Sequence, residues 1–331
     1  MAPRILILGK LVWGEKDLQE QLGGIAEVIH VEDVDRAAFL KGFESGGKYE
    51  GAVGVLHTVE SNSTYGNIDK ELVNALPSTI KWIAHKGAGY DDVDVIACRD
   101  KGITVSHTPK AVDEGTAETA LFLLLATVRN FTLAEASLRA GNWKPKTMES
   151  TSYELSSRTL GVLGLGGIGG LLAEMVRPMG MRVIYHNRKP ASDAPKGCEY
   201  FADLDEMLAQ TDVLSVHIPL NDKTEHFVND SVIRKMKKGS VIINTARGKV
   251  IDEAAMIKAL EDGHLSAIGL DVFPDEPKVN PRLLEFPTAT LLPHVGTENQ
   301  DSRHHMEMMC VVNLRDFLTK GKGENIVPEC R

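Results

Sequence analysis

The feature that most constrains the fold is an apolar run followed directly by a glycine fingerprint and a helical pattern. Residues 160–163 are apolar, and Gly164, Gly166 and Gly169 follow them with the spacing GxGxxG. In this context Gly164 permits a tight turn, Gly166 lets the backbone approach a pyrophosphate, and Gly169 lets the helix pack close to the strand. The helix N-terminus adds unpaired N–H groups and the positive end of its dipole. The pattern predicts a dinucleotide-binding Rossmann unit that begins at Gly164.

Apolar runs and helical patterns alternate after the fingerprint. The apolar runs predict strands at residues 160–164, 182–186, 213–218, 240–245, 267–272 and 290–292. The stretches between them predict helices at residues 167–179, 204–210, 229–236 and 252–262. Such regular alternation is typical of a parallel, doubly wound sheet, so the predicted fold class is α/β.

The part of the chain before the fingerprint shows the same alternation over fewer strands. Apolar runs predict strands at residues 5–8, 52–56, 80–84 and 103–105. Residues 114–128 are apolar and rich in helix formers, which predicts a buried helix that links two domains. Residues 139–157 are polar and interrupted by glycine and proline, so we expect an extended surface arm. A last helix is predicted at residues 300–319.

Composition favours a globular enzyme that acts on small molecules. The 331 residues, 43% of them hydrophobic, suffice for about two domains. The formal net charge of −9 argues against nucleic acid as a partner, and the apolar runs are too short for a membrane span. Four scattered cysteines lack metal-ligand spacing: Cys98, Cys198, Cys310 and Cys330. We therefore expect a cytoplasmic protein without membrane contact and without a structural metal.

The end of the strand predicted at residues 182–186 indicates which dinucleotide binds. A carboxylate at this place accepts hydrogen bonds from the ribose 2′-hydroxyl of NAD(H) and repels the 2′-phosphate of NADP(H). The chain has Asn187, Arg188 and Lys189 here, and neither Asp nor Glu. Because Arg188 can bind a phosphate and Lys189 adds positive charge, we expect NADP(H) to be preferred, with NAD(H) possible. The alternative is that both cations are solvated turn residues.

Three polar residues, Arg247, Glu276 and His294, follow predicted strands at the edge where a doubly wound sheet binds ligands. Reduction of a 2-keto acid by hydride requires a cation that holds the carboxylate and an acid that protonates the new alkoxide. Arg247 and His294 have this chemistry, and a carboxylate such as Glu276 favours and orients the protonated imidazole. Taken singly, each has a plain alternative as a surface ion-pair partner, a solvated loop acid or a satisfied loop histidine.

With these motifs the sequence resembles the D-isomer-specific 2-hydroxyacid dehydrogenase family, in particular its glyoxylate/hydroxypyruvate reductase and D-mandelate dehydrogenase-like members. The matching segments lie at residues 86–91, 164–169, 216–224, 244–248, 271–277 and 293–296. The resemblance implies an NADP(H)-preferring enzyme that reversibly reduces 2-keto acids to D-2-hydroxy acids. It also implies a flavodoxin-like substrate domain (residues 1–109 and 297–331), a Rossmann cofactor domain (residues 110–296) and an active site in the interdomain cleft.

The resemblance assigns roles to individual residues. Arg247 matches the substrate-binding arginine, His294 the general acid/base and Glu276 the acid paired with it. Ala88 and Gly89, together with Arg247 and His294, match the substrate site, and the turn at Ala88 binds the substrate carboxylate through its N–H groups. The residues that match the family's cofactor site are Thr116, Gly164, Gly166, Gly167, Ile168, Gly169, Asn187, Arg188, Lys189, His217, Pro219, Thr224, Thr245, Ala246, Asp271 and Gly296.

Some details of the resemblance bear on later sections. Asp271 matches the residue that holds the nicotinamide carboxamide, and Gly167 stands where many members have an arginine near the pyrophosphate. The family is usually dimeric, so we expect a homodimer in which the helix at residues 114–128 and the following arm form the interface. Trp143 of this arm either reaches the partner's site or anchors the arm. Trp13 lies in a loop that sets substrate preference in the family; it suggests a large or aromatic keto acid, unless it only packs there.

Other interpretations of the same motifs are weaker. An L-specific lactate or malate dehydrogenase has its fingerprint near the N-terminus, and formate dehydrogenase has glutamine where Glu276 stands. Phosphoglycerate dehydrogenase carries a regulatory C-terminal domain, for which this chain lacks room. The rival of another class is a dinucleotide-sensing binding protein of the corepressor type, which keeps the same three polar residues without turnover. The short tails and Arg188 disfavour it, whereas inactivity towards many 2-keto acids would favour it.

Overall fold

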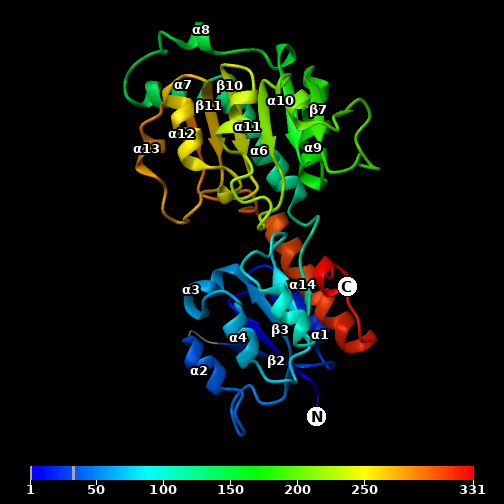
Figure 1. Cartoon of the computed structure of the whole chain (residues 1–331). Helices are drawn as coiled ribbons and strands as arrows, with labels where there is room; N and C mark the ends of the chain where they lie inside the picture. The colour runs from blue at the N-terminus through cyan, green and yellow to red at the C-terminus, as the bar shows by residue number, and fades with distance from the viewer. Residues whose placement is uncertain (1, 32–33) are drawn as a thin grey trace. The chain divides into compact units, whose positions relative to one another are not determined.

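The structure is a computed structural model that describes residues 2–31 and 34–331 and falls into two compact α/β units (Figure 1). Unit 1 consists of Met1–Val112 and Glu298–Arg331, and unit 2 consists of Asp113–Thr297. Within the described residues each unit contains one all-parallel sheet, with five strands in unit 1 and seven in unit 2. The predicted α/β class with two doubly wound parallel sheets is confirmed.

The sheet of unit 1 has the strand order β2-β1-β3-β4-β5, which is that of flavodoxin-like folds. In β1 the side chains alternate between two cores: Ile5 and Ile7 pack on one face, and Leu6 and Leu8 on the other. Because both faces are covered, residues 5–8 of the strand are all apolar. The strands are β1 (Arg4–Leu8), β2 (Glu27–Val31), β3 (Ala52–Thr58), β4 (Trp82–Lys86) and β5 (Thr104–Ser106).

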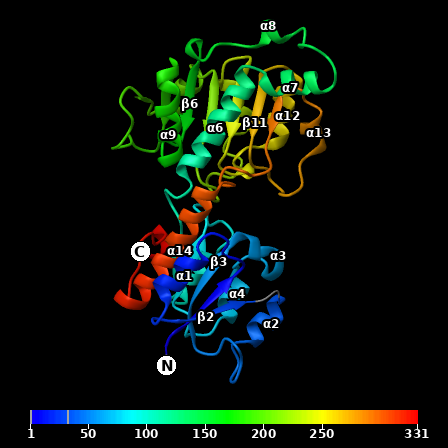
Figure 2. The same ribbon diagram turned by 180° about the vertical axis from the view of Figure 1, so that it is seen from behind.

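Helices from both ends of the chain cover the sheet of unit 1. On one face lie α1 (Glu15–Leu22) and the long α14 (Gln300–Lys320), which buries Val311 and Leu314 against this sheet. Figure 2 shows these two helices next to each other, although they stand near opposite ends of the sequence. The helices that contribute to the core on the other face are α2 (Arg36–Lys41), α3 (Asn62–Tyr65), α4 (Lys70–Ala75) and α5 (Val95–Asp100).

The sheet of unit 2 has the order β12-β11-β10-β9-β6-β7-β8, so the chain runs outward in opposite directions from the pair β6 and β9. This is the Rossmann order, and ligands bind where the direction of winding reverses. The strands are β6 (Thr159–Leu163), β7 (Arg182–His186), β8 (Glu199–Tyr200), β9 (Val213–Val216), β10 (Ser240–Asn244), β11 (Leu265–Leu270) and β12 (Ala289–Leu291).

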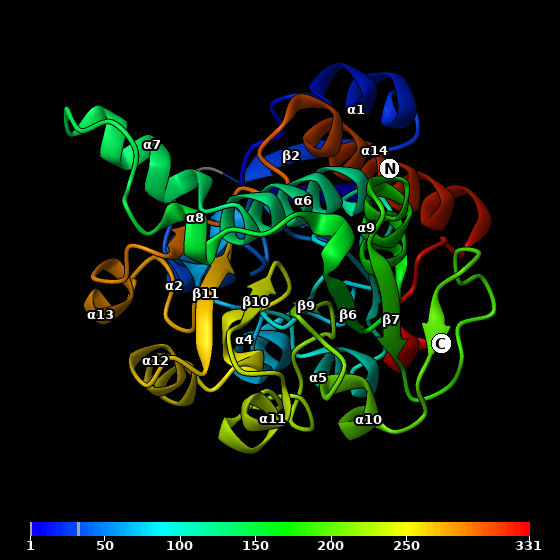
Figure 3. The ribbon, with the colours of Figure 1, turned by 90° about the horizontal axis from the view of Figure 1, so that it is seen from above.

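Two groups of helices cover the sheet of unit 2, as Figure 3 shows. On one face lie α6 (Asp113–Val128) and α9 (Gly167–Val176), which share a core with Val162 and Ile243. The helices on the other face are α10 (Leu204–Leu208), α11 (Asp230–Lys235), α12 (Glu253–Glu261) and α13 (Pro281–Leu284). The helix predicted at residues 114–128 is thus the buried first helix of unit 2.

An arm between α6 and β6 contains α7 (Phe131–Arg139) and the single turn α8 (Met148–Thr151). It is mostly exposed, and Trp143 has 81% of its surface accessible. The arm is therefore at the surface, as the glycine and proline pattern predicted, although it is partly helical. No single helix among the described residues is long and apolar enough to cross a membrane; α6 and α7 meet that test only as a pair, which is bent by 72°.

The two strands that the sequence analysis missed, β2 and β8, are edge strands. Only one of five residues of β2 is buried, and β8 is two residues long with none buried. An edge strand covered on one side carries polar residues, so it lacks the continuous apolar run that marks the central strands.

Candidate functional site

The glycine fingerprint forms the turn between β6 and α9. Gly164 has a φ of +97°, and a Cβ on it would lie 3.0 Å from the carbonyl oxygen of His217. A Cβ on Gly169 would lie 2.8 Å from the carbonyl oxygen of Gly164, so neither position accepts a side chain. At Gly166, by contrast, no described atom lies within 4 Å of the place of a Cβ. The turn therefore leaves open space for a pyrophosphate beside the N-terminus of α9, which begins at Gly167.

Gly167 faces the first residue of α6. A Cβ on Gly167 would collide with the carboxylate of Asp113. The side chain that many family members carry at this position would thus displace Asp113 here, which gives the glycine a physical reason. Ile168 follows half-buried in the first turn of α9.

Asn187 and the two cations after it have different surroundings at the end of β7. Oδ1 of Asn187 accepts a hydrogen bond from the N–H of Leu165 at 2.7 Å, and Nδ2 donates to the carbonyl of Leu165 at 3.2 Å. Asn187 therefore fastens the glycine turn to β7, a role that the sequence analysis did not assign. Arg188 and Lys189 are exposed, and neither has an ion-pair partner among the described residues. Both cations are available to a phosphate.

Two buried polar atoms near the ends of β9 and β10 have no hydrogen-bond partner within the described residues: Nδ1 of His217 and Oγ1 of Thr245. Nε2 of His217 lies 2.6 Å from Oγ of Ser215, and burial lowers the pKa of His217 to about 4, so the ring is neutral. A buried polar atom without a partner is costly and indicates a group that the protein chain does not supply.

Asp271, at the end of β11, lies next to two other expected cofactor residues, Thr116 and Gly296. Its carboxylate accepts hydrogen bonds from the N–H groups of Val295 at 2.8 Å and Gly296 at 2.9 Å. A Cβ on Gly296 would lie 3.1 Å from Oδ2 of Asp271 and 3.3 Å from Oγ1 of Thr116, so these three residues meet. Burial raises the pKa of Asp271, an effect that the two N–H bonds oppose.

Pro219 and Thr224 close the loop after β9. The hydroxyl of Thr224 donates to the carbonyl of Pro219 at 2.6 Å and accepts from the N–H of Asn221 at 2.8 Å.

The donor set of unit 2 fits a nicotinamide dinucleotide, because it combines an open glycine turn, two exposed cations and polar atoms without partners among the described residues along successive strand ends. This fit rests on the open space at Gly166 and the orphaned atom of His217.

His294 and Glu276 form a hydrogen-bonded pair in unit 2. Nδ1 of His294 lies 2.7 Å from Oε2 of Glu276, and because a carboxylate only accepts, Nδ1–H is the donor. Burial opposes ionisation of Glu276, but the bonds from His294 and from the N–H of Phe273 hold its pKa below the usual value. The side chains of His294 and Glu276 are 46% and 34% exposed. Nε2 of His294 has no partner in the described part of the chain, so it can give or take a proton.

Arg247 follows β10 in a turn that Asn244 holds. Nδ2 of Asn244 donates to the carbonyl of Arg247 at 2.9 Å, and Oδ1 accepts from the N–H of Ala246 at 2.9 Å. Nη1 of Arg247 donates to the carbonyl of Ala246 at 2.8 Å. The sequence analysis missed Asn244, although it is the residue that fixes the Arg247 turn.

The Arg247 turn packs directly on the loop that carries Glu276. A Cβ on Gly248 would collide with the backbone of Phe273, so only glycine permits this approach. The positive charge of Arg247 is one of the effects that lower the pKa of Glu276. The structure thus brings together the three residues that the sequence analysis proposed as catalytic, Arg247, Glu276 and His294, within unit 2.

The turn at Ala88 and Gly89 lies in unit 1, directly after β4. Nδ1 of His107 is 2.8 Å from the carbonyl oxygen of Ala88, and Nε2 of His85 is 2.9 Å from that of Gly89. Both carbonyls therefore accept from a histidine. The N–H groups of Ala88 and Gly89 donate to no acceptor within the described residues, which leaves them free to bind an anion.

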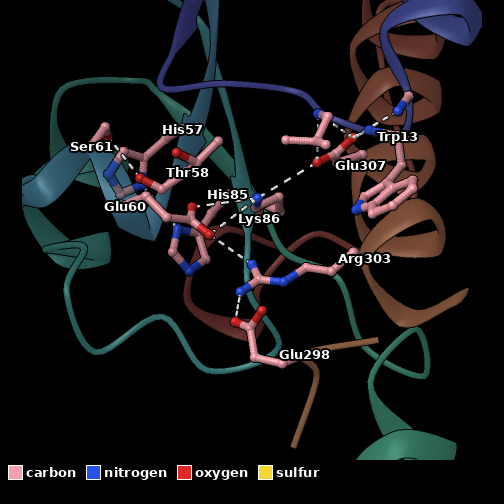
Figure 4. Close-up of polar contacts among 12 residues, drawn as sticks. Trp13, His57, Thr58, Glu60, Ser61, His85, Lys86, Glu298, Arg303 and Glu307 are labelled. Atoms are coloured by element: carbon pink, nitrogen blue, oxygen red, sulfur yellow. Dashed lines mark hydrogen bonds and ion pairs between the residues drawn. The ribbon is translucent and has the colours of Figure 1, made fainter. Parts of the chain in front are cut away.

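A cavity of about 550 Å³ lies in unit 1 where β1, β3 and β4 end, lined by Trp13, Tyr65 and Lys86 among others. An alternating chain of charges runs along its wall: Glu298, Arg303, Glu60, Lys86 and Glu307 (Figure 4). Burial opposes ionisation of Glu60, yet Lys86 keeps its pKa below the usual value.

Glu307 of α14 holds the loop after β1. Its carboxylate accepts hydrogen bonds from the N–H groups of Val12, Trp13 and Gly14 at 2.7 to 3.2 Å. Glu307 is 1% exposed, and its counterion Lys86 lies 3.7 Å away with a side chain that is 4% exposed. Trp13 is 43% exposed and lines the cavity, so its role in substrate preference stays a prediction.

A polar cluster that was not predicted lies in unit 1, where the buried His57 and His85 contact the half-buried Asn62 and Asp92. We expected no metal site, and the ligand atoms of His57, His85 and Asp92 do lie within 4.8 Å of one another. However, Asp92 approaches Nε2 of His85, whereas His57 approaches Nδ1 of His85. The Asp92 carboxylate and His57 therefore lie on opposite sides of the His85 ring.

Comparison with known proteins agrees with this geometry. The family model for the D-isomer specific 2-hydroxyacid dehydrogenase, NAD binding domain, matches residues 121–296. The 4-methyl-2-oxopentanoate reductase A of Aspergillus oryzae is 38% identical over 327 residues, which cover 99% of this chain and 98% of that protein. The crystal structure of a glyoxylate reductase from Paecilomyes thermophila has a TM-score of 0.94 at 39% identity, covering 100% of this chain and 99% of the other.

A second solved structure carries a cofactor. The NADPH-dependent glyoxylate/hydroxypyruvate reductase from Sinorhizobium meliloti, in complex with NADP and malonate, has a TM-score of 0.82 at 32% identity and covers 100% of this chain and 98% of its own. These findings support an oxidoreductase of the 2-hydroxyacid dehydrogenase and reductase type with a nicotinamide dinucleotide cofactor. The resemblance inferred from the motifs is confirmed, and the chain belongs to the D-isomer-specific 2-hydroxyacid dehydrogenase family.

Proposed function

We propose that this protein is an NADP(H)-preferring reductase that converts 2-keto acids to D-2-hydroxy acids and also runs in reverse. The observation that carries the proposal is the pair of His294 and Glu276, in which an exposed imidazole keeps one nitrogen without a partner among the described residues. We assign the cofactor to unit 2 and the substrate carboxylate to Arg247 and the turn at Ala88 and Gly89. The alternative of a dinucleotide sensor without turnover predicts tight NADPH binding and no reduction of any keto acid.

His294 would protonate the carbonyl oxygen as it becomes an alkoxide. The donated proton comes from Nε2, while Nδ1–H of His294 continues to donate its hydrogen bond to Glu276. Because the pKa of Glu276 is held below its usual value, this residue remains a carboxylate and stabilises the imidazolium form of His294 before the transfer. In the oxidation direction the neutral ring would take the proton from the hydroxyl group.

Arg247 and the turn at Ala88 and Gly89 would orient the keto acid. The guanidinium of Arg247 can hold the carboxylate and draw electron density from the carbonyl, which stabilises the developing negative charge. The unengaged N–H groups of Ala88 and Gly89 supply further donors to the carboxylate.

The dinucleotide, when bound, supplies the hydride. The turn from Gly164 to Gly169 would hold its pyrophosphate, and Arg188 and Lys189 would bind the 2′-phosphate that distinguishes NADP(H). The proposed contacts to the rest of the cofactor come from the residues grouped along the strand ends, which are Thr116, Asn187, His217, Pro219, Thr224, Thr245, Ala246, Asp271 and Gly296.

Initial rates with NADPH and NADH test the proposal. The rates are measured against glyoxylate, hydroxypyruvate, phenylpyruvate, benzoylformate and 2-ketoisocaproate. We expect faster turnover with NADPH, and we expect Arg188→Ala to raise the KM for NADPH about tenfold without changing the KM for NADH, because one charged hydrogen-bonding partner of the phosphate is lost. Lys196→Ala removes an exposed cation elsewhere in unit 2 and is the matched control. Faster turnover with NADH would contradict the proposed preference.

We also propose that the protein is a homodimer joined through α6 and the arm. Large apolar side chains are exposed there: Phe131 at 44%, Leu138 at 57% and Trp143 at 81%. A second copy that covers them would remove this apolar surface from water. Sedimentation equilibrium should report a dimer, and Leu138→Ser with Trp143→Ser should weaken it; a monomeric wild type would contradict the proposal.

A further inference from the structure

Two buried histidines of unit 1 face each other across neighbouring strands (Figure 4). His57 lies in β3 and His85 in β4, and the register of the two strands places them opposite each other. They are 1% and 0% exposed, and their Nδ1 atoms are 3.0 Å apart. Two nitrogens at this distance either share a proton or force two lone pairs together.

The surroundings of His57 fix the proton on its other nitrogen. Nε2 of His57 lies 2.8 Å from Oδ1 of Asn62, and Nδ2 of Asn62 lies 2.6 Å from Oδ2 of Asp92. Asp92 is ionised, because His85 lowers its pKa although burial opposes this effect. A carboxylate only accepts, so the Asn62 amide must donate to Asp92 and present its oxygen to His57. Nε2 of His57 therefore carries hydrogen.

The surroundings of His85 lead to the same conclusion for its Nε2. That atom lies 2.9 Å from the carbonyl oxygen of Gly89 and 3.5 Å from Oδ1 of Asp92, and both of these oxygens only accept. With hydrogen on both Nε2 atoms, a hydrogen bond between the two Nδ1 atoms requires a third proton. Three protons on two imidazoles give the pair one positive charge, which Asp92 balances.

We infer that His57 and His85 share one proton between their Nδ1 atoms, and that this singly charged pair positions the turn that binds the substrate carboxylate. The role assigned to the turn rests on the proposed function, whereas the proton count does not. Burial and the charge of His85 lower the pKa of His57, so the pair does not take up a second charge.

The pair acts on the turn through Gly89. Nε2–H of His85 holds the carbonyl of Gly89, while the N–H groups of Ala88 and Gly89 have no acceptor among the described residues and can bind an anion. The fit is tight, because a Cβ on Gly87 would collide with Nε2 of His85 and would lie 2.8 Å from the Gly89 oxygen. The positive charge of the buried His57 and His85 pair also favours binding of a carboxylate at the turn.

Nitrogen NMR of the histidine rings tests the shared proton directly. We would label histidine with ¹⁵N, remove metals with EDTA and record spectra without cofactor or substrate. Assignment by His57→Phe and His85→Leu should show protons on both Nε2 atoms and one proton coupled to both Nδ1 nuclei. Two unprotonated Nδ1 atoms would overturn the inference, as would a tightly bound metal ion, detected by elemental analysis, in place of the proton.

Steady-state kinetics test the positioning role. We expect His85→Leu to raise the KM for the keto acid about tenfold, because a charged hydrogen-bond donor to the turn is lost, with kcat and the KM for NADPH unchanged. Gly87→Ala keeps both histidines and should raise the same KM by separating His85 from Gly89. His30→Gln replaces an exposed histidine of unit 1 and is the control.

The outcomes of the two experiments distinguish failure of the positioning role from failure of the proposed function. Equal losses of kcat, keto acid affinity and cofactor affinity in His85→Leu and Gly87→Ala would show general damage and overturn the positioning role. If the wild-type protein reduces no keto acid, the proposed function fails, while the NMR experiment still decides whether the proton is shared.

Discussion

The pair of His294 and Glu276 in unit 2 and the pair of His57 and His85 in unit 1 differ in how many histidine ring nitrogens have partners among the described residues. In unit 2, His294 is 46% exposed and uses one nitrogen to hold Glu276, which leaves the other open. In unit 1, His57 and His85 are buried, and all four ring nitrogens have partners. A group that transfers protons must keep one position unengaged, whereas a fully satisfied buried network fixes geometry. This contrast supports the proposal that histidine takes part in proton transfer in unit 2 and fixes geometry in unit 1.

The largest effect expected from this contrast is on turnover. His294→Gln removes the group that gives or takes the proton, so kcat for keto acid reduction should fall about a thousandfold. Stopped-flow and steady-state absorbance of NADPH measure it. His264→Gln replaces a half-buried histidine of unit 2 that only bonds the carbonyl of Ile233, and it should keep full activity. A His294→Gln enzyme with near-normal kcat would remove His294 from the mechanism.

The next effect is on stability and concerns the buried pair. Asp92→Asn leaves the shared positive charge without its counterion, so the free energy of unfolding should fall by about 3 kcal/mol. Urea unfolding followed by tryptophan fluorescence gives this value. Glu44→Gln neutralises an exposed carboxylate of the same unit and should change stability little. An unchanged stability in Asp92→Asn would mean that the pair carries no charge.

A smaller effect is expected when the exposed pair loses its carboxylate. In Glu276→Gln the imidazolium form of His294 has no counterion, so the rate of reduction at neutral pH should fall about tenfold to a hundredfold. The pKa of Glu276 is held low, so in the wild type the carboxylate is present at neutral pH and is lost only as the pH falls below its usual range. A pH–rate profile identical to the wild type would contradict the pairing.

The smallest effect is expected at His30, which lies 3.4 Å from Glu15 in an exposed pair. His30→Gln should leave kcat unchanged and alter the free energy of unfolding by less than about 0.5 kcal/mol, because exposed ion pairs contribute little. A large loss of activity in His30→Gln would show that an exposed histidine–carboxylate pair outside the proposed site also affects the rate. The pairing of His294 with Glu276 would then no longer support the catalytic assignment of His294.

The central strands and the cofactor turn could be predicted because their determinants are local in sequence. Strands β6, β9 and β10 are buried on both faces, so their sequences are mostly apolar. Gly164 and Gly169 lie at positions where a side chain has no room. Arg247, Glu276 and His294 were proposed because each follows a strand, and parallel strands end at one edge.

The buried histidine pair could not be predicted, because its members are 28 residues apart and neither lies in a motif. Only the register of β3 against β4 places His57 opposite His85. The bonds of Asn187 to Leu165 and of Asn244 to the Arg247 turn were also missed, since a side chain that holds a neighbouring backbone leaves no pattern in the sequence.

The carboxylate of Glu307 ties the last helix to the first loop, and α14 covers the same face as α1. Domains commonly fold as they leave the ribosome, in order from the N-terminus. Unit 2 is one continuous stretch, whereas unit 1 also needs residues 298–331, which cover part of its sheet. We therefore expect unit 2 to be able to fold during synthesis before unit 1 is complete.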